Sequence, residues 1–207
     1  VQAIDFDELL LAASDNDLLI RVIVKAGQFV VAGSTLAIVS SEEEAGDTCM
    51  LRLAEPFIIG EQRTSQQDAE YSIHQLVEVA IRALSPGIND PYTAIDCIDK
   101  LASALCFLTT RELPGENCFD GEGKLRLIIK PFTFAGMMNA SFDQIRQYGS
   151  TSVAVTIRLL EMLTLIAAQT TRTEQRQAVQ RQGEMILRTS RKALPEQNDK
   201  EDVLQRY

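Results

Sequence analysis

The chain has 207 residues, of which 45% are hydrophobic and 24% are charged, and its formal net charge is −9. This composition is typical of a globular protein with a real core, in one large domain or two small ones. The negative charge and the absence of Trp argue against a nucleic-acid partner, because such proteins use Lys and Arg on phosphates and aromatic rings on bases.

The N-terminal sixty residues are predicted to contain mainly short strands. Val1–Ile4 is the first strand, and Asp5 caps a helix over Phe6–Ser14. β-Branched and apolar runs separated by glycine turns predict three more strands: Leu18–Val24, Phe29–Val31 and Leu36–Val39.

Residues 42–62 complete this β-rich module. Glu42–Glu44 is expected to be a solvated loop. Met50–Ile59 is predicted to be one more strand, and Pro56 places it at an edge because proline cannot donate to a ladder.

From Asp68 the apolar spacing becomes helical. One helix ends at Ser85-Pro86-Gly87, and its predicted inward face is Ile73, Leu76, Val77, Ala80 and Leu84. A second helix begins after Asp90, an N-cap residue followed by Pro91 at the first helical position, and runs to about Thr110.

The remainder is predicted to be a loop, a strand and three helices. These are Leu113–Gly123, Lys124–Lys130, Ser141–Tyr148, Thr151–Gln169 and Thr173–Ala193. We therefore expect an α+β fold, with a β-rich module over 1–62, a mainly helical body with one strand over 63–194, and a polar, disordered tail over 195–207.

Glycines in the first module have a regular spacing. Gly27, Val30, Gly33 and Leu36 recur every three residues and are followed by Val39. This spacing resembles half of a biotinyl or lipoyl carrier hammerhead. Such carriers attach their prosthetic group to a Lys in the next hairpin, where this chain has Ser40-Ser41-Glu42-Glu43. The resemblance implies hammerhead-like strands without carrier chemistry, and no cofactor is expected.

A second resemblance rests on the ten residues RALSPGINDP, Arg82–Pro91. Other segments share it: Val1–Asp5, Gly60, Arg63-Thr64, Gln67-Asp68, Gln75-Leu76, Thr93-Ala94 and Phe142–Gln147. Together they resemble the bacterial family of predicted integral membrane proteins called domain of unknown function twenty-two fifty-four, over most of residues 1–193.

This second resemblance implies an architecture and no activity. Family members carry N-terminal transmembrane helices, which this chain lacks, followed by a soluble C-terminal region. An even number of spans would leave that region in the cytoplasm, at the inner membrane. No catalytic residues follow from it.

The loop before the second helix is the first candidate site. A helix N-terminus attracts anions, so one hypothesis is that this loop binds a small anionic ligand or an adjacent subunit. The residues of this hypothesis are Arg63, Thr64, Asp68, Arg82, Ser85, Gly87, Asn89, Asp90 and Thr93. The alternative is a scaffold in which Asp90 caps the helix, Asn89 holds the turn, and Arg82 pairs with Asp68 or Asp90.

A polar stripe with a spacing of four is the weaker candidate. Glu70, His74 and Glu78 could ligate a divalent metal from one helix face. Such stripes are more often ion pairs, here Glu78 with Arg82, so no metal is expected.

Other chemistry has little support. The sequence contains no nucleophile elbow, phosphate loop or dinucleotide fingerprint. Asp96 and Asp99 could act as acid and base, but their spacing also fits an exposed helix face. The four Cys residues lack framework spacing, which favours a reducing compartment.

The sequence therefore favours a non-enzymatic cytoplasmic domain of a membrane protein. It would serve homo-oligomer assembly, or regulation and sensing for a channel- or transporter-like membrane part, with subunit contacts through Thr151–Gln169 and Thr173–Ala193. The alternative is a domain that binds a small anion, or an enzyme, with its site around Arg63, Arg82 and the Ser85–Asp90 loop.

Overall fold

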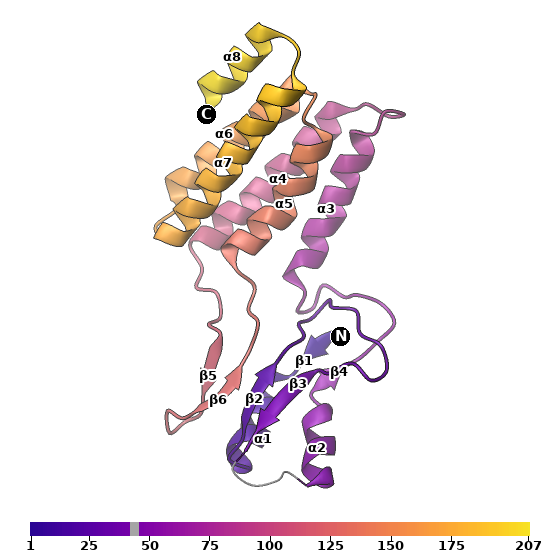
Figure 1. Cartoon of the computed structure of the whole chain (residues 1–207), viewed down its shortest axis with the longest axis vertical. Coiled ribbons are helices and arrows are strands. Elements are labelled where there is room, and N and C mark those ends of the chain that lie inside the picture. The colour runs from indigo at the N-terminus through magenta and orange to yellow at the C-terminus, as the bar shows by residue number, and fades with distance from the viewer. Residues whose placement is uncertain (42–45) are drawn as a thin grey trace. The chain divides into compact units, whose positions relative to one another are not determined.

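The computed structural model describes residues 1–41 and 46–207. These form two compact units, Val1–Tyr71 with Leu113–Phe132, and Ser72–Glu112 with Thr133–Tyr207 (Figure 1). Strands lie in the first unit and the long helices in the second, so the predicted α+β class is confirmed. The expected loop Glu42–Glu44 and the end of the hammerhead hairpin lie outside the described residues.

The first unit is built on a four-stranded sheet with the order β3-β2-β6-β5. β2 (Leu19–Val22) pairs antiparallel with β3 (Ala37–Ser40) and parallel with β6 (Leu125–Ile128). β6 also pairs antiparallel with β5 (Asn117–Phe119). This pairing brings residues 113–132 into the first unit, so the division differs from the predicted one at residue 62.

A separate two-stranded ladder joins β1 (Ala3–Ile4) to β4 (Phe57–Ile58). α1 (Phe6–Asp15) follows β1, and the Asp5 carboxylate accepts a hydrogen bond from the backbone N–H of Glu8, as predicted for an N-cap. The apolar core of this unit includes Ile4, Leu9, Ile20, Val22 and Leu127, all at most 1% exposed.

The predicted strand over Met50–Ile59 is wrong for most of its length. The structure has α2 (Asp47–Ala54), followed by the two residues of β4. Cys49 and Leu53, one turn apart, both pack on the core of the first unit. Met, Leu and Ala are good helix formers, and this core contact explains why the helix forms.

Two other predictions in this unit are corrected. Phe29–Val31 is not a strand: it lies between two turns with positive φ at Gly27 and Gly33, and Phe29 is 87% exposed. The predicted loop Leu113–Gly123 contains β5, because the Asp120–Gly123 turn closes a hairpin onto β6.

The second unit is a bundle of helices. α4 (Pro91–Thr109) packs against α5 (Phe134–Tyr148) and α6 (Val153–Gln169), and α7 (Thr173–Ala193) packs against α5 and α6. α3 (Ala69–Ala83) buries Ile73, Val77, Ala80 and Ala83. The core contains Ile98, Leu101, Phe142, Ile145, Leu159 and Ile166.

The C-terminal tail is helical, which corrects the predicted disorder of 195–207. α8 (Gln197–Arg206) packs against α6 and α7. Val203 is completely buried, and Arg206 lies 3.6 Å from the Glu161 carboxylate. The buried Val203 and the Arg206–Glu161 pair hold this mostly polar segment in place, and composition alone does not reveal these contacts.

Candidate anion-binding pocket

The predicted N-cap of α4 is confirmed. One Asp90 carboxylate oxygen accepts hydrogen bonds from the backbone N–H groups of Tyr92 (3.1 Å) and Thr93 (3.2 Å). The other accepts from the Thr93 hydroxyl at 2.6 Å, and this hydroxyl contributes most to lowering the pKa of Asp90. Asn89 takes a positive φ of 50° in the preceding turn. The anion position at this helix end is therefore filled by the chain's own carboxylate.

Arg82 forms an exposed ion pair with Glu78, so the predicted pairing of Arg82 with Asp68 or Asp90 is wrong. Asp68 instead accepts two hydrogen bonds from Arg63, from Nε at 2.8 Å and Nη2 at 2.5 Å. Asp68 is 1% exposed. The Thr64 hydroxyl oxygen is also buried and has no hydrogen-bond partner in the described part of the chain.

The nine predicted site residues fall in both units. Arg63, Thr64 and Asp68 belong to the first unit. The other six belong to the second: Arg82, Ser85, Gly87, Asn89, Asp90 and Thr93. Their convergence on one ligand stays a prediction.

The polar stripe of α3 forms ion pairs. Glu70 lies 2.9 Å from Lys25 Nζ, and Glu78 pairs with Arg82. Among residues 1–41 and 46–207, no three His, Cys, Asp or Glu side chains form a group that could hold a metal. Of these two ion pairs, only Glu78–Arg82 uses the four-residue helix spacing.

Asp99 is also part of an ion pair. Its two carboxylate oxygens accept hydrogen bonds from Nε (2.6 Å) and Nη2 (2.7 Å) of Arg158 on α6. Arg158 Nη1 also donates to the Glu161 carboxylate at 3.1 Å. Asp99 thus joins α4 to α6, and this geometry gives no support to an acid–base role.

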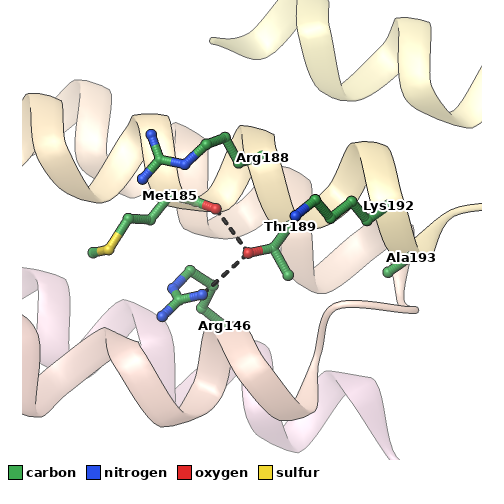
Figure 2. A pocket seen from close by; sticks show the side chains of 6 residues that line it. All are labelled: Arg146, Met185, Arg188, Thr189, Lys192 and Ala193. Atoms are coloured by element: carbon green, nitrogen blue, oxygen red, sulfur yellow. Dashed lines mark hydrogen bonds between the residues drawn. The ribbon is translucent and has the colours of Figure 1, made fainter.

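The most chemically suggestive hollow lies between α5 and α7 and measures about 500 Å³. It is lined by Arg146, Met185, Arg188, Thr189, Lys192 and Ala193 (Figure 2). Three of these six side chains are cationic, in a chain whose net charge is −9.

Arg146 is the innermost of the three cations, with a side chain 14% exposed. Its Nη1 donates to the Thr189 hydroxyl at 3.1 Å, and that hydroxyl donates to the Met185 carbonyl at 2.8 Å (Figure 2). Arg146 Nη2 lies 3.6 Å from the Asp143 carboxylate. Arg146 Nε is buried and has no acceptor among the described residues.

Arg188 and Lys192 are one turn apart on α7 and both are exposed. Glu184 lies 3.7 Å from Arg188, beyond ordinary hydrogen-bond length. Sequence analysis missed this pocket, because the only sequence signal is the four-residue spacing on α7, while Arg146 comes from another helix.

Comparison with known proteins now bears on the whole chain. A family model described as "Predicted membrane protein (DUF2254)" matches residues 1–165. The chain belongs to this family. Uncharacterized protein Mb1321c of Mycobacterium bovis and Uncharacterized protein Rv1290c of Mycobacterium tuberculosis are each 31% identical to this chain over 208 residues.

These alignments cover 99% of this chain but 40% of each mycobacterial protein, so the chain spans about two fifths of their length. The α7 residues of the pocket lie beyond the part that the DUF2254 model matches, whereas Arg146 lies within it. No solved structure matches the chain. None of the helices that the structure describes is long and apolar enough to cross a membrane.

Proposed function

We propose that this chain is the extramembrane part of a longer DUF2254 membrane protein, and that it assembles or regulates the membrane part without catalysing a reaction. The observation that carries this proposal is the match of residues 1–165 to a family described as a predicted membrane protein. The relatives contain a further three fifths of their length outside the aligned region, which leaves room for a membrane part.

The surfaces of both units support a position in water. Exposed ion pairs include Lys124 with Asp17 in the first unit, and Arg82 with Glu78 in the second. A charged side chain in hydrocarbon costs several kcal/mol, about 2.5–3.5 kcal/mol at a helix centre on insertion scales. These surfaces therefore favour an aqueous environment over lipid.

The proposed location is the cytoplasmic side of a bacterial inner membrane. All four cysteines are free thiols. Burial raises the pKa of the Cys97, Cys106 and Cys118 thiols, which keeps them protonated and unreactive. Free, unreactive thiols fit a reducing compartment.

Membrane extraction tests the proposal. In a bacterial host the longer protein that contains this chain is expected to stay in the membrane pellet after alkaline carbonate washing, whereas the 207-residue chain alone appears in the supernatant. A longer protein that is washed off with the chain would contradict a membrane anchor.

We also propose that the protein works as a homo-oligomer, since closed symmetric assemblies are the usual way to surround a pore. α6 is a weaker contact surface than expected, because it buries its apolar residues against α4, α7 and α8 within the chain. Light scattering on the detergent-solubilised longer protein is expected to give one defined multiple of the subunit mass. A monomeric mass would rule out the assembly function and leave regulation of the membrane part as the proposed function.

A second candidate function is binding of a small anionic ligand. The specific observation that favours it is a hollow lined by three cations, Arg146, Arg188 and Lys192. In this version the chain senses the ligand and transmits its presence to the membrane part.

A further inference from the structure

We propose that the pocket formed by Arg146, Arg188 and Lys192 binds the phosphate group of a phosphate ester, either free in solution or in the headgroup of an anionic phospholipid. This inference names the ligand class for the sensing version of the proposed function and rests on it.

Arg146 carries a charge that its surroundings neutralise only in part. The nearest carboxylate oxygen, Asp143 Oδ1, is 3.6 Å from Nη2 and already accepts a hydrogen bond from Gln182 Nε2 at 3.0 Å. The other partner, the Thr189 hydroxyl, is neutral. A buried guanidinium with an unused N–H is costly unless an acceptor reaches it. An oxyanion in the hollow that Arg146 lines would complete the neutralisation of its charge.

Arg188 and Lys192 add the charge that an oxyanion with more than one negative charge requires. The Arg188–Glu184 pair is exposed on both sides and 3.7 Å long, so it is weak and can exchange for a better acceptor. Lys192 has no carboxylate within 4 Å in the part of the chain described, and it lines the same hollow (Figure 2). Guanidinium forks match phosphate oxygens in pairs, and a Lys adds a point charge.

The rest of the pocket wall suits the organic part of an ester. Met185 and Ala193 line it together with the aliphatic stems of the cations. A hollow of about 500 Å³ is of the size that small-molecule sites occupy. The three cations gather here although the chain as a whole carries a net charge of −9.

The positions of two of these cations also fit a structural role. Arg146 lies in the last turn of α5, and Lys192 in the last turn of α7, where positive charge offsets the helix dipole. A purely structural role predicts lower stability on substitution and no response to phosphate. Binding measurements separate the two roles.

The test uses the 207-residue chain and titration calorimetry with inorganic phosphate and pyrophosphate at low ionic strength. Pyrophosphate is expected to bind more tightly than phosphate, with a Kd below about 1 mM. Arg146→Gln and Arg188→Gln should each weaken it at least about tenfold. Arg176→Gln is the matched control, because it removes one exposed charge from the same helix outside the pocket. Its Kd should stay within about twofold of the unmodified chain.

Vesicles distinguish the two sources of phosphate. The chain is mixed with phosphatidylcholine vesicles that either contain or lack phosphatidylglycerol. Cosedimentation only with the phosphatidylglycerol vesicles supports the lipid headgroup as the ligand, provided that Arg188→Gln abolishes it. Pyrophosphate binding without this vesicle binding supports a free phosphate ester. If Arg146→Gln does not fold, Arg188→Gln and Lys192→Gln carry the test.

Three results would overturn the proposal. The first is that the chain binds neither phosphate, nor pyrophosphate, nor phosphatidylglycerol vesicles, and the second is that all pocket variants retain the binding. The third is binding that is lost in Arg82→Gln but kept in Arg188→Gln. The last result would move the site to the Ser85–Asp90 loop. Carbonate extraction is independent of these titrations, so loss of phosphate binding and loss of the membrane assignment are separate outcomes.

Discussion

Gly27 occupies a position where any side chain would be strained and would displace Asp68. Its φ is +84°, and a Cβ built there would lie 2.0 Å from the Asp68 carboxylate that Arg63 binds. Gly33 has almost the same φ, +87°, but open space around it. Substituting each glycine therefore distinguishes the energetic cost of backbone strain from that of a steric clash.

Gly33→Ala is expected to lower the free energy of unfolding by about 1–2 kcal/mol, the cost of a left-handed alanine. Gly27→Ala should cost clearly more, because it also displaces Asp68 from Arg63. Urea denaturation of both variants measures the difference. Equal losses would mean that the Asp68 side chain moves away at no cost.

Arg126 links two carboxylates of the first unit, Asp120 at 2.7 Å and Asp17 at 2.6 Å. The hydrogen bond from Arg126 is the largest cause of the lowered pKa of Asp120, while Lys124 and then Arg126 lower the pKa of Asp17. Carboxylates with a lowered folded-state pKa stabilise the fold above their unfolded pKa of about 3.9. That stabilisation is lost as the pH falls through the folded values.

Arg126→Met is therefore expected to reduce stability at pH 7 and to flatten its acid dependence. Thermal unfolding at pH 7 and at pH 3.5 gives both quantities. Lys130→Met, which removes an exposed Lys of the same unit, should keep the acid dependence of the unmodified chain. An unchanged acid profile in Arg126→Met would rule out this cluster as its source.

At the scale of the element, the start of α4 depends on Asp90. Asn caps helices about as well as Asp does, whereas Ala cannot accept the Tyr92 and Thr93 N–H groups. Asp90→Asn should keep a melting temperature close to that of the unmodified chain, and Asp90→Ala should lower it. Circular dichroism measures both. If Asp90→Ala melts normally, the loop is not the scaffold described above.

α8 is held by few contacts, and Val203 is its one fully buried residue. Val203→Asp places a charge in an apolar site and should detach the helix while α4–α7 remain folded. Hydrogen exchange should show at least about tenfold faster exchange over 197–206. Leu204→Asp, at an exposed neighbour, should leave exchange unchanged. Equal effects of the two changes would contradict this packing.

The elements that sequence predicted well are those with several agreeing local signals. Asp90-Pro91 marks the start of α4, and the bounds of α7 match the prediction, Thr173–Ala193. The failures came from contacts that are distant in sequence. β5 needs β6, α2 needs the core beneath Cys49 and Leu53, and the pocket needs Arg146 beside Thr189. Local propensity does not contain such pairings.

At the scale of the whole molecule, charge is unevenly distributed. The chain carries −9, yet α7 holds five cationic and two acidic residues. Such a helix in a membrane-protein family is consistent with an anionic ligand near the membrane surface, and the bundle around it provides a rigid support. The central claim is that both units stand in water on one side of a membrane.

Thiol labelling in the longer protein tests that claim most directly. With the native cysteines replaced by alanine, Thr35→Cys in the first unit and Gln177→Cys in the second introduce exposed thiols. We predict that a membrane-impermeant maleimide labels both in inside-out vesicles and neither in intact spheroplasts. Labelling of the two positions from opposite sides, or of neither until detergent is added, would contradict the account.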